Sequence, residues 1–165
     1  MLRASIFAGL AVCSVPATAC ILPAPIAPLP HESQQAFHER QKASLAAIEY
    51  DSRRSAQIGF LDQSTAVFIG TIATSRDISV DVAKGHEVAI RPLSPIKGSL
   101  PDQSVRLRDT VFTGCGLSGG GSATSAQPGD YVIVFEPQNV GIEAKDAVLP
   151  DLLTALAIYA RDSTQ

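Results

Sequence analysis

The sequence contains no tryptophan, and only six phenylalanines and three tyrosines occur among its 165 residues. Aromatic side chains can therefore fill little of a core, and Val, Ile, Leu and Ala have to supply most of it. The chain also lacks an excess of positive charge, because its net charge at pH 7 is −3. A protein without a basic field does not collect phosphates, so we expect neither nucleic acid nor an acidic lipid surface as a partner.

Long apolar runs are missing as well, and this excludes a transmembrane span from the expected features. The stretch Ile6 to Val15 is too short to cross a bilayer. Arg3 precedes it and the small residues Ala17-Thr18-Ala19 follow it, a pattern typical of an export signal over residues 1–19. Cleavage would leave Cys20 as the first residue of a periplasmic or secreted protein.

Cysteine is scarce, and its few positions carry information. Of three cysteines, Cys13 lies in the signal, so the mature chain keeps Cys20 and Cys115. In an oxidising compartment two cysteines most simply form one disulfide, which would stabilise the fold by about 4 to 5 kcal/mol in the chain-entropy model. The alternative is that Cys20 carries a lipid and tethers the protein to a membrane, although Ala17 stands where lipoprotein processing sites usually have Leu.

The N-terminal third of the mature chain divides into two kinds of segment. Residues 20–30 alternate apolar residues with proline, which predicts an extended strip. Residues 31–58 contain neither proline nor glycine and are rich in good helix formers, so they predict a surface helix, with a break expected near Asp51. At the other end, Pro150 begins a predicted short helix within residues 150–165.

Residues 59–149 have the patterns of β-strands. The segments Ala66–Ile72 and Tyr131–Phe135 are apolar on both faces, which predicts buried strands, and Gly70 indicates a bulge in the first of them. Three further segments alternate apolar and polar residues, which predicts half-exposed strands. They are residues 77–82, residues 88–93 and the segment around Val105 and Leu107.

Two connections between these strands are also predicted. Lys84-Gly85-His86 is expected to form a turn, and the glycine- and serine-rich segment Gly116–Gly129 is expected to form a long flexible loop. Five strands joined by turns predict a mainly β fold, a small five-stranded antiparallel OB-like barrel. The N-terminal helix and the short C-terminal helix would pack outside the barrel.

Several of these features recur together in a known family. They are, in order, Cys20 after the signal, Ala66–Ile72, Lys97-Gly98, Cys115-Gly116-Leu117 and Gly129–Phe135. This arrangement resembles the netrin-like domain, the OB-type barrel of tissue inhibitors of metalloproteinases and of many poorly characterised secreted bacterial proteins.

The resemblance implies a disulfide between Cys20 and Cys115. It also implies that the amine and carbonyl of Cys20 could chelate the zinc of a protease, with Ile21, Gly116 and Leu117 contacting the same partner. The chain departs from the inhibitors at Leu22, where they have a second cysteine, and it lacks their other disulfides.

The remaining candidate groups of polar residues do not match a known catalytic motif. Ser118 lies in a Gly-x-Ser-x-Gly pattern, but more glycine follows it and all three histidines precede it, unlike a nucleophile elbow. The histidines have no further ligands at metal-binding spacing, so we expect no metal site and no cofactor. Arg106 and Arg108 most simply face solvent, or they line an anionic groove of the barrel.

The sequence therefore predicts an exported, non-catalytic binding module whose partner is another extracytoplasmic protein. A narrower form of this prediction is a metalloprotease inhibitor acting through Cys20. The alternative is a lipid-anchored cell-envelope protein with a structural or assembly role. An exported serine hydrolase using Ser118 is the least favoured hypothesis.

Overall fold

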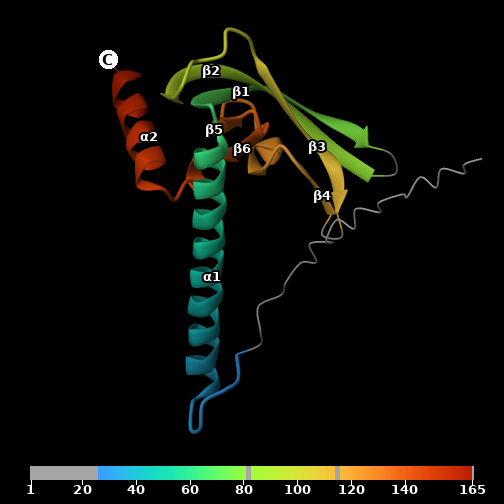
Figure 1. The fold of residues 1–165 in the computed structure, drawn as a ribbon. Helices are drawn as coiled ribbons and strands as arrows, with labels where there is room; N and C mark the ends of the chain where they lie inside the picture. The colour runs from blue at the N-terminus through green and yellow to red at the C-terminus, as the bar shows by residue number, and fades with distance from the viewer. Residues whose placement is uncertain (1–25, 81–82, 114–115, 165) are drawn as a thin grey trace, which may run out of the picture.

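The computed structural model describes residues 26–80, 83–113 and 116–164, which form an antiparallel sheet flanked by helices (Figure 1). The elements are α1 (Gln34–Gln63), β1 (Ala66–Val80), β2 (Ala83–Lys97), β3 (Val105–Thr113), β4 (Gly116–Gly119), the 3₁₀ helix η1 (Ser122–Ser125), β5 (Tyr131–Glu136), β6 (Val140–Glu143), the 3₁₀ helix η2 (Ala144–Asp146) and α2 (Pro150–Asp162). The strand order is β4-β3-β2-β1-β5-β6, so β1 and β2 lie at the centre.

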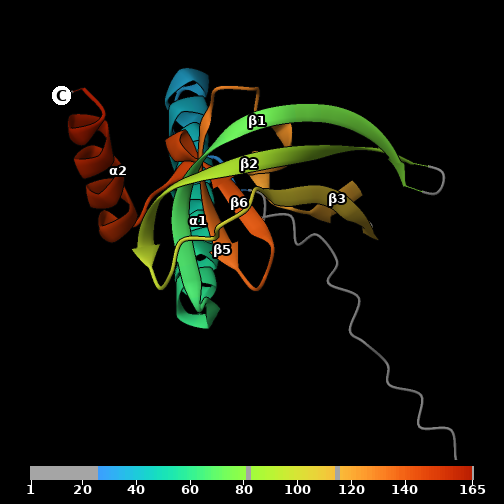
Figure 2. The same ribbon diagram turned by 90° about the horizontal axis from the view of Figure 1, so that it is seen from above.

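The sheet is antiparallel as predicted, but it does not close into a barrel. Strands β3, β2, β1, β5 and β6 form a five-stranded antiparallel sheet (Figure 2), and β4 extends it at the edge of β3 (Figure 1). Closure requires the two edge strands to pair, and in the described residues β4 and β6, which have only four residues each, do not pair with each other. The predicted barrel is therefore wrong, and with a 30-residue α1 the fold is mixed α/β rather than mainly β.

The two central strands form one long hairpin. The predicted strand at 66–72 and the described part of the one at 77–82 are a single strand, β1, which pairs with β2 up to Val80 and Ala83, and residues 81–82 lie outside the described residues. The predicted turn at Lys84-Gly85-His86 is wrong, because these residues lie in β2 and pair with β1. The bulge predicted at Gly70 is confirmed by a shift of register between Ile69 and Gly70.

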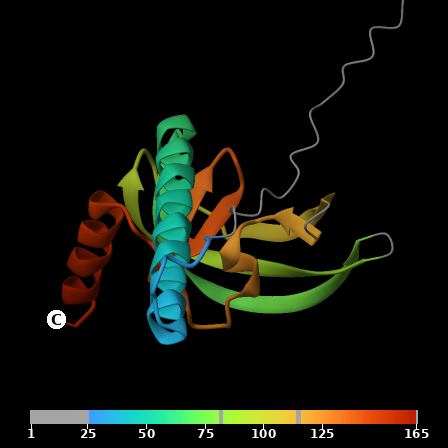
Figure 3. The ribbon, with the colours of Figure 1, turned by 90° about the horizontal axis from the view of Figure 1, so that it is seen from below.

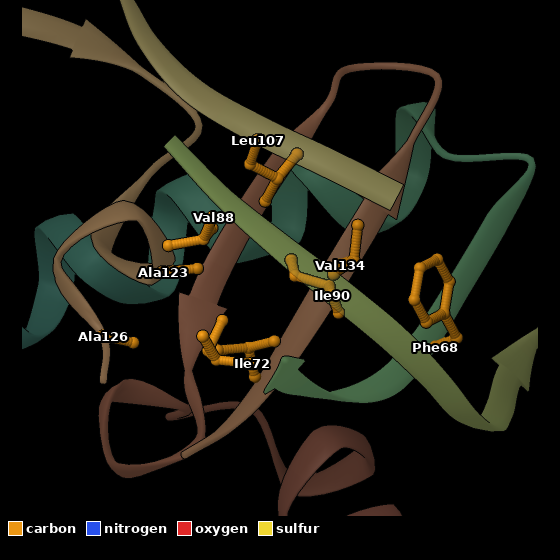
Figure 4. Packing of buried hydrophobic residues seen from close by; sticks show 9 residues of the cluster. Phe68, Ile72, Val88, Ile90, Leu107, Ala123, Ala126 and Val134 are labelled. Atoms are coloured by element: carbon orange, nitrogen blue, oxygen red, sulfur yellow. The ribbon is translucent and has the colours of Figure 1, made fainter. Parts of the chain in front are cut away.

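One hydrophobic core fills the inner face of the curved sheet (Figure 4). Its buried residues are Phe68, Ile72, Val88, Ile90, Leu107, Ala123, Ala126, Val132 and Val134. Ala123 belongs to η1 and Ala126 follows it, so the segment predicted as a flexible loop contributes to the core. The prediction was wrong because small residues carry no hydrophobic periodicity, although they are what a close backbone approach requires.

A second core joins the other face of β1 and β5 to the helices. Its buried residues are Val67, Ile133, Phe135, Ile142, Ala147, Leu149 and Leu152. Ile58, Phe60 and Leu61, at the end of α1, pack against it. Gln57 adds a buried polar clamp, because its amide nitrogen donates to the carbonyl of Asp146 at 2.8 Å and its oxygen accepts from the N–H of Val148 at 2.9 Å.

Only the last turns of α1 take part in this packing. The helix runs without interruption past Asp51, and no residue between Gln34 and Ala56 is buried. Its N-terminal part therefore projects from the sheet (Figure 1), and in the view from below α1 lies in front of the strands (Figure 3). α2 begins at Pro150 as predicted and buries Leu152. None of the helices in the described ranges is long and apolar enough to cross a membrane.

Candidate functional site

The residues predicted to contact a partner protein lie only partly within the described residues. Cys20, Ile21 and Cys115 lie outside the described residues, so their disulfide and their contacts stay predictions. Gly116 and Leu117 lie in β4, where they pair with Thr113 and Phe112.

The described end of the proline-rich strip lies against α1. Arg40 donates to both carboxylate oxygens of Glu32, at 2.9 and 2.8 Å, and to the carbonyl of Ala27 at 2.9 Å. The hydrogen bonds from Arg40 to this carboxylate, with one from the N–H of Leu29, lower the pKa of Glu32 to about 2. Ser33 caps the first turn by accepting from the N–H of Ala36. The strip is thus fixed to the start of α1.

The predicted catalytic and metal-binding candidates remain separate. Ser118 pairs with Val111 within a β-hairpin, which differs from the strand-to-helix turn of a nucleophile elbow. His86 lies 3.1 Å from the carboxylate of Asp77, while His31 and His38 lie at the far end of the molecule around the start of α1. Within the described ranges, no group of three or more His, Cys, Asp or Glu side chains could hold a metal ion.

A cluster of charged side chains lies on the outer face of the central strands. Glu87 on β2 pairs with Arg76 on β1 and with Arg108 on β3, and Arg106 lies two residues before Arg108. The alternation that buries Val88 on the inner face puts all four charged side chains on the opposite face. Register therefore brings three arginines to one carboxylate.

The contacts within this cluster are unequal. Arg76 donates two hydrogen bonds to Oε1 of Glu87, at 2.9 and 2.6 Å. Arg108 lies 3.1 Å from Oε2, whereas Arg106 lies 3.6 Å from Oε1, which is beyond hydrogen-bonding distance. The side chain of Glu87 is 6 % exposed, while those of the arginines are 53 to 65 % exposed.

The cluster holds the buried carboxylate in its charged form. The hydrogen bonds from Arg76, together with the positive charges of all three arginines, lower the pKa of Glu87 against the opposing effect of burial. One negative charge faces three positive ones. In the described part of the chain, Glu87 is the only carboxylate within 4.0 Å of these guanidinium groups.

A cavity of about 450 Å³ adjoins this cluster where the sheet fails to close. Arg106 and Arg108 on β3 form one side of it, and Gln138, Asn139 and Val140, at the turn from β5 to β6, form another. Gln138 uses its side-chain oxygen to accept from Ser64 at 3.0 Å, which leaves its amide group able to donate. Arginine residues and amide residues therefore line the same cavity.

A second cavity, of about 530 Å³, lies between α1 and β6 and is more apolar. Ala56, Phe60 and Ile142 line it, together with Arg53 and Asp146, which form an ion pair of 3.1 Å. Gly119 and Val140 line both cavities, so the two adjoin each other. A third, of about 500 Å³, separates the end of β2 from α2.

Comparisons with protein-family models, with curated proteins and with solved structures find no match. The resemblance to the netrin-like domain therefore stays a prediction. Sequence reasoning paired Arg106 with Arg108 but missed Glu87 and Arg76. The available signal was a lone carboxylate on a strand between two arginine-bearing strands, and reading it requires the register of the sheet.

Proposed function

We propose that this protein is an exported, non-catalytic binding module of netrin-like type whose partner is another extracytoplasmic protein. The projecting part of α1, residues 34–56, supplies the binding surface. The observation that carries this proposal is that about six turns of helix bury no residue against their own fold. A helix of this kind contributes little to the stability of the sheet. Apart from residues such as Arg53, which pairs with Asp146, its exposed side chains are able to pack on another molecule.

Two exposed apolar side chains define the face that would bind. Leu45 and Ile48 are 48 and 46 % exposed, and a spacing of three residues puts them on the same side of the helix. Ser44 and Ser52 flank them on this face, and such small side chains allow a second surface to approach closely. The partner is therefore expected to offer an apolar groove or helix, as in helix-in-groove recognition.

The experiment replaces this apolar face by charge. In the double variant Leu45→Asp/Ile48→Asp, complex formation should weaken at least about a hundredfold, because two buried apolar anchors are replaced by desolvated carboxylates. The partner is first captured by a photo-crosslinking residue at position 45 or 48 in the exporting host, and its affinity for purified variants is then measured.

The matched control is Ala43→Asp/Ala47→Asp, which adds the same charge on the opposite side of the same exposed helix. It should bind the partner like the wild type. Equal weakening by both double variants would show that helix content or net charge, and not the Leu45 and Ile48 face, governs binding. Unchanged affinity of Leu45→Asp/Ile48→Asp would refute the proposed surface.

A narrower proposal is inhibition of a zinc protease through the amine and carbonyl of Cys20. It is supported by the resemblance to the netrin-like domain and by the chemistry of the ligand, since an adjacent amine and carbonyl form a compact bidentate group for an open zinc position.

A further inference from the structure

The arginine cluster on the outer face of the sheet has more positive charge than its own fold uses. One guanidinium group is enough to pair with one carboxylate, because it can donate two parallel hydrogen bonds to it. Arg76 already donates two hydrogen bonds to Glu87, and Arg108 contacts the other oxygen. Three guanidinium groups and one carboxylate leave two positive charges that have no counterpart in the described part of the chain.

Within the described ranges, three other Lys and Arg side chains pair with carboxylates, and none of them shares its carboxylate with a second cation. Arg40 pairs with Glu32, Lys145 pairs with Glu143, and Arg53 contacts two carboxylates, those of Glu49 and Asp146. The whole chain carries a net charge of −3, so the cluster is a positively charged patch on a negatively charged protein. Bringing like charges together costs free energy, and an anion bound between them would offset that cost.

The position of the cluster supplies a place for such an anion. The 450 Å³ cavity at the open edge is lined by Arg106 and Arg108, by the hydroxyl-bearing Thr110 and by the amides Gln138 and Asn139. Cavities of about 300 to 1,000 Å³ hold small organic ligands. Arg106 is the guanidinium that Glu87 engages least, at 3.6 Å, and within the described residues it contacts no other carboxylate.

We infer that the open edge of the sheet binds a small anion carrying at least two carboxylate or phosphate charges, held by Arg106 and Arg108. Glu87 acts as a positioning residue, because it holds the guanidinium groups side by side against their mutual repulsion. Gln138 and Asn139 line the same cavity, and their amides are able to supply neutral donors. This site is separate from the projecting surface of α1.

The test is isothermal titration calorimetry of the mature protein with phosphate, pyrophosphate and citrate at one ionic strength. Pyrophosphate or citrate should bind at least about ten times more tightly than phosphate, since a second charge reaches a second guanidinium. Preference for pyrophosphate would identify a phosphorylated ligand, and preference for citrate a polycarboxylate. No saturable heat with any probe up to about 10 mM would overturn the inference.

Two variants locate the site. Arg106→Gln removes the least engaged guanidinium while Arg76 and Arg108 keep their contacts with Glu87, and it should weaken binding of the preferred probe about tenfold or more. Asn139→Asp adds a negative charge to the cavity wall without touching the arginine cluster, and it should weaken binding similarly. Aspartate suits this position because Asn139 has a φ of 53°, a region that Asn and Asp tolerate.

The controls separate the site from general charge effects. Arg161→Gln removes one positive charge from α2, and Asn139→Gly keeps the turn without adding charge. Arg161→Gln should bind the probe like the wild type, and Asn139→Gly should bind it more tightly than Asn139→Asp. If Arg106→Gln and Arg161→Gln weaken binding equally, the anion is attracted by net charge alone and the proposed site is wrong.

Discussion

Gly59 and Gly70 differ in what surrounds their missing side chains. Gly59 lies inside α1, and a Cβ atom placed on it would meet no atom within 4 Å. Glycine in a helix interior costs about 0.5 to 1 kcal/mol relative to alanine, because the unfolded chain loses more freedom on folding. We therefore expect Gly59→Ala to raise the free energy of unfolding by about that amount, measured by urea denaturation.

Gly70 provides the opposite case within the same fold. A Cβ there would overlap Cγ2 of Ile90 and lie 3.0 Å from the carbonyl oxygen of Arg91. Gly70→Ala should therefore lower the free energy of unfolding, since two packed central strands would have to separate. A loss of stability in Gly59→Ala would contradict the open space around this position.

At the scale of single elements, the sequence pattern predicted those strands and helix ends that depend on neighbouring residues alone. The apolar run in β1 and the alternating residues in β2 correctly predicted strands, and Pro150 correctly predicted the start of α2. β4, η1 and β6 were missed, because Gly116–Ser125 and Val140–Glu143 are too short or too rich in small residues to show a period. Gly141 illustrates this, since a Cβ there would lie 2.6 Å from Leu107 and 2.8 Å from Ala123.

The candidate site depends on relations that no local pattern contains. The alternation of β3 placed Arg106 and Arg108 on one face, but their contact with Glu87 follows from the register between β3 and β2. Whether the sheet closes depends on how its two edges meet, and the edge strands are far apart in the sequence. Sequence reasoning therefore predicted a barrel where the structure has an open edge with a cavity.

The cluster around Glu87 joins three strands, so its protonation should affect the stability of the sheet. Because the pKa of Glu87 is lower in the folded state than the ordinary value of 4.5, its contribution is fully present above about pH 5 and is lost as pH falls through the folded-state value. We expect Glu87→Gln to be less stable than the wild type by about 1 to 3 kcal/mol at pH 7. Urea denaturation at pH 7, 5 and 3 measures the difference.

The difference between wild type and Glu87→Gln should shrink as pH falls below 4.5, since the unfolded wild type then takes up a proton at Glu87 more readily than the folded protein does. The matched control is Glu39→Gln on the exposed surface of α1, which should follow the wild type at each pH. A difference that stays constant with pH would mean that packing of the side chain, and not its charge, stabilises the three strands.

At the scale of the whole molecule, stability is distributed unevenly. The sheet and the ends of the two helices share two cores, whereas residues 34–56 of α1 lie outside both. The ion pair of Arg53 with Asp146 and the clamp at Gln57 connect the helix to the domain near its C-terminal end. An isolated helix without packing is marginal in water, so this projecting part can open without unfolding the sheet.

This difference predicts the pattern of amide hydrogen exchange. Amides of residues 38–52 should exchange at least about a hundredfold faster than those of Phe68 and Val134 in the buried strands, because their opening costs only local helix unwinding. Exchange followed by mass spectrometry at neutral pH measures both. Addition of the protein partner should slow exchange around Leu45 and Ile48, because binding supplies the packing that the domain lacks. Equal protection of α1 and the strands in the isolated protein would show that another surface, such as a second copy, already covers the helix.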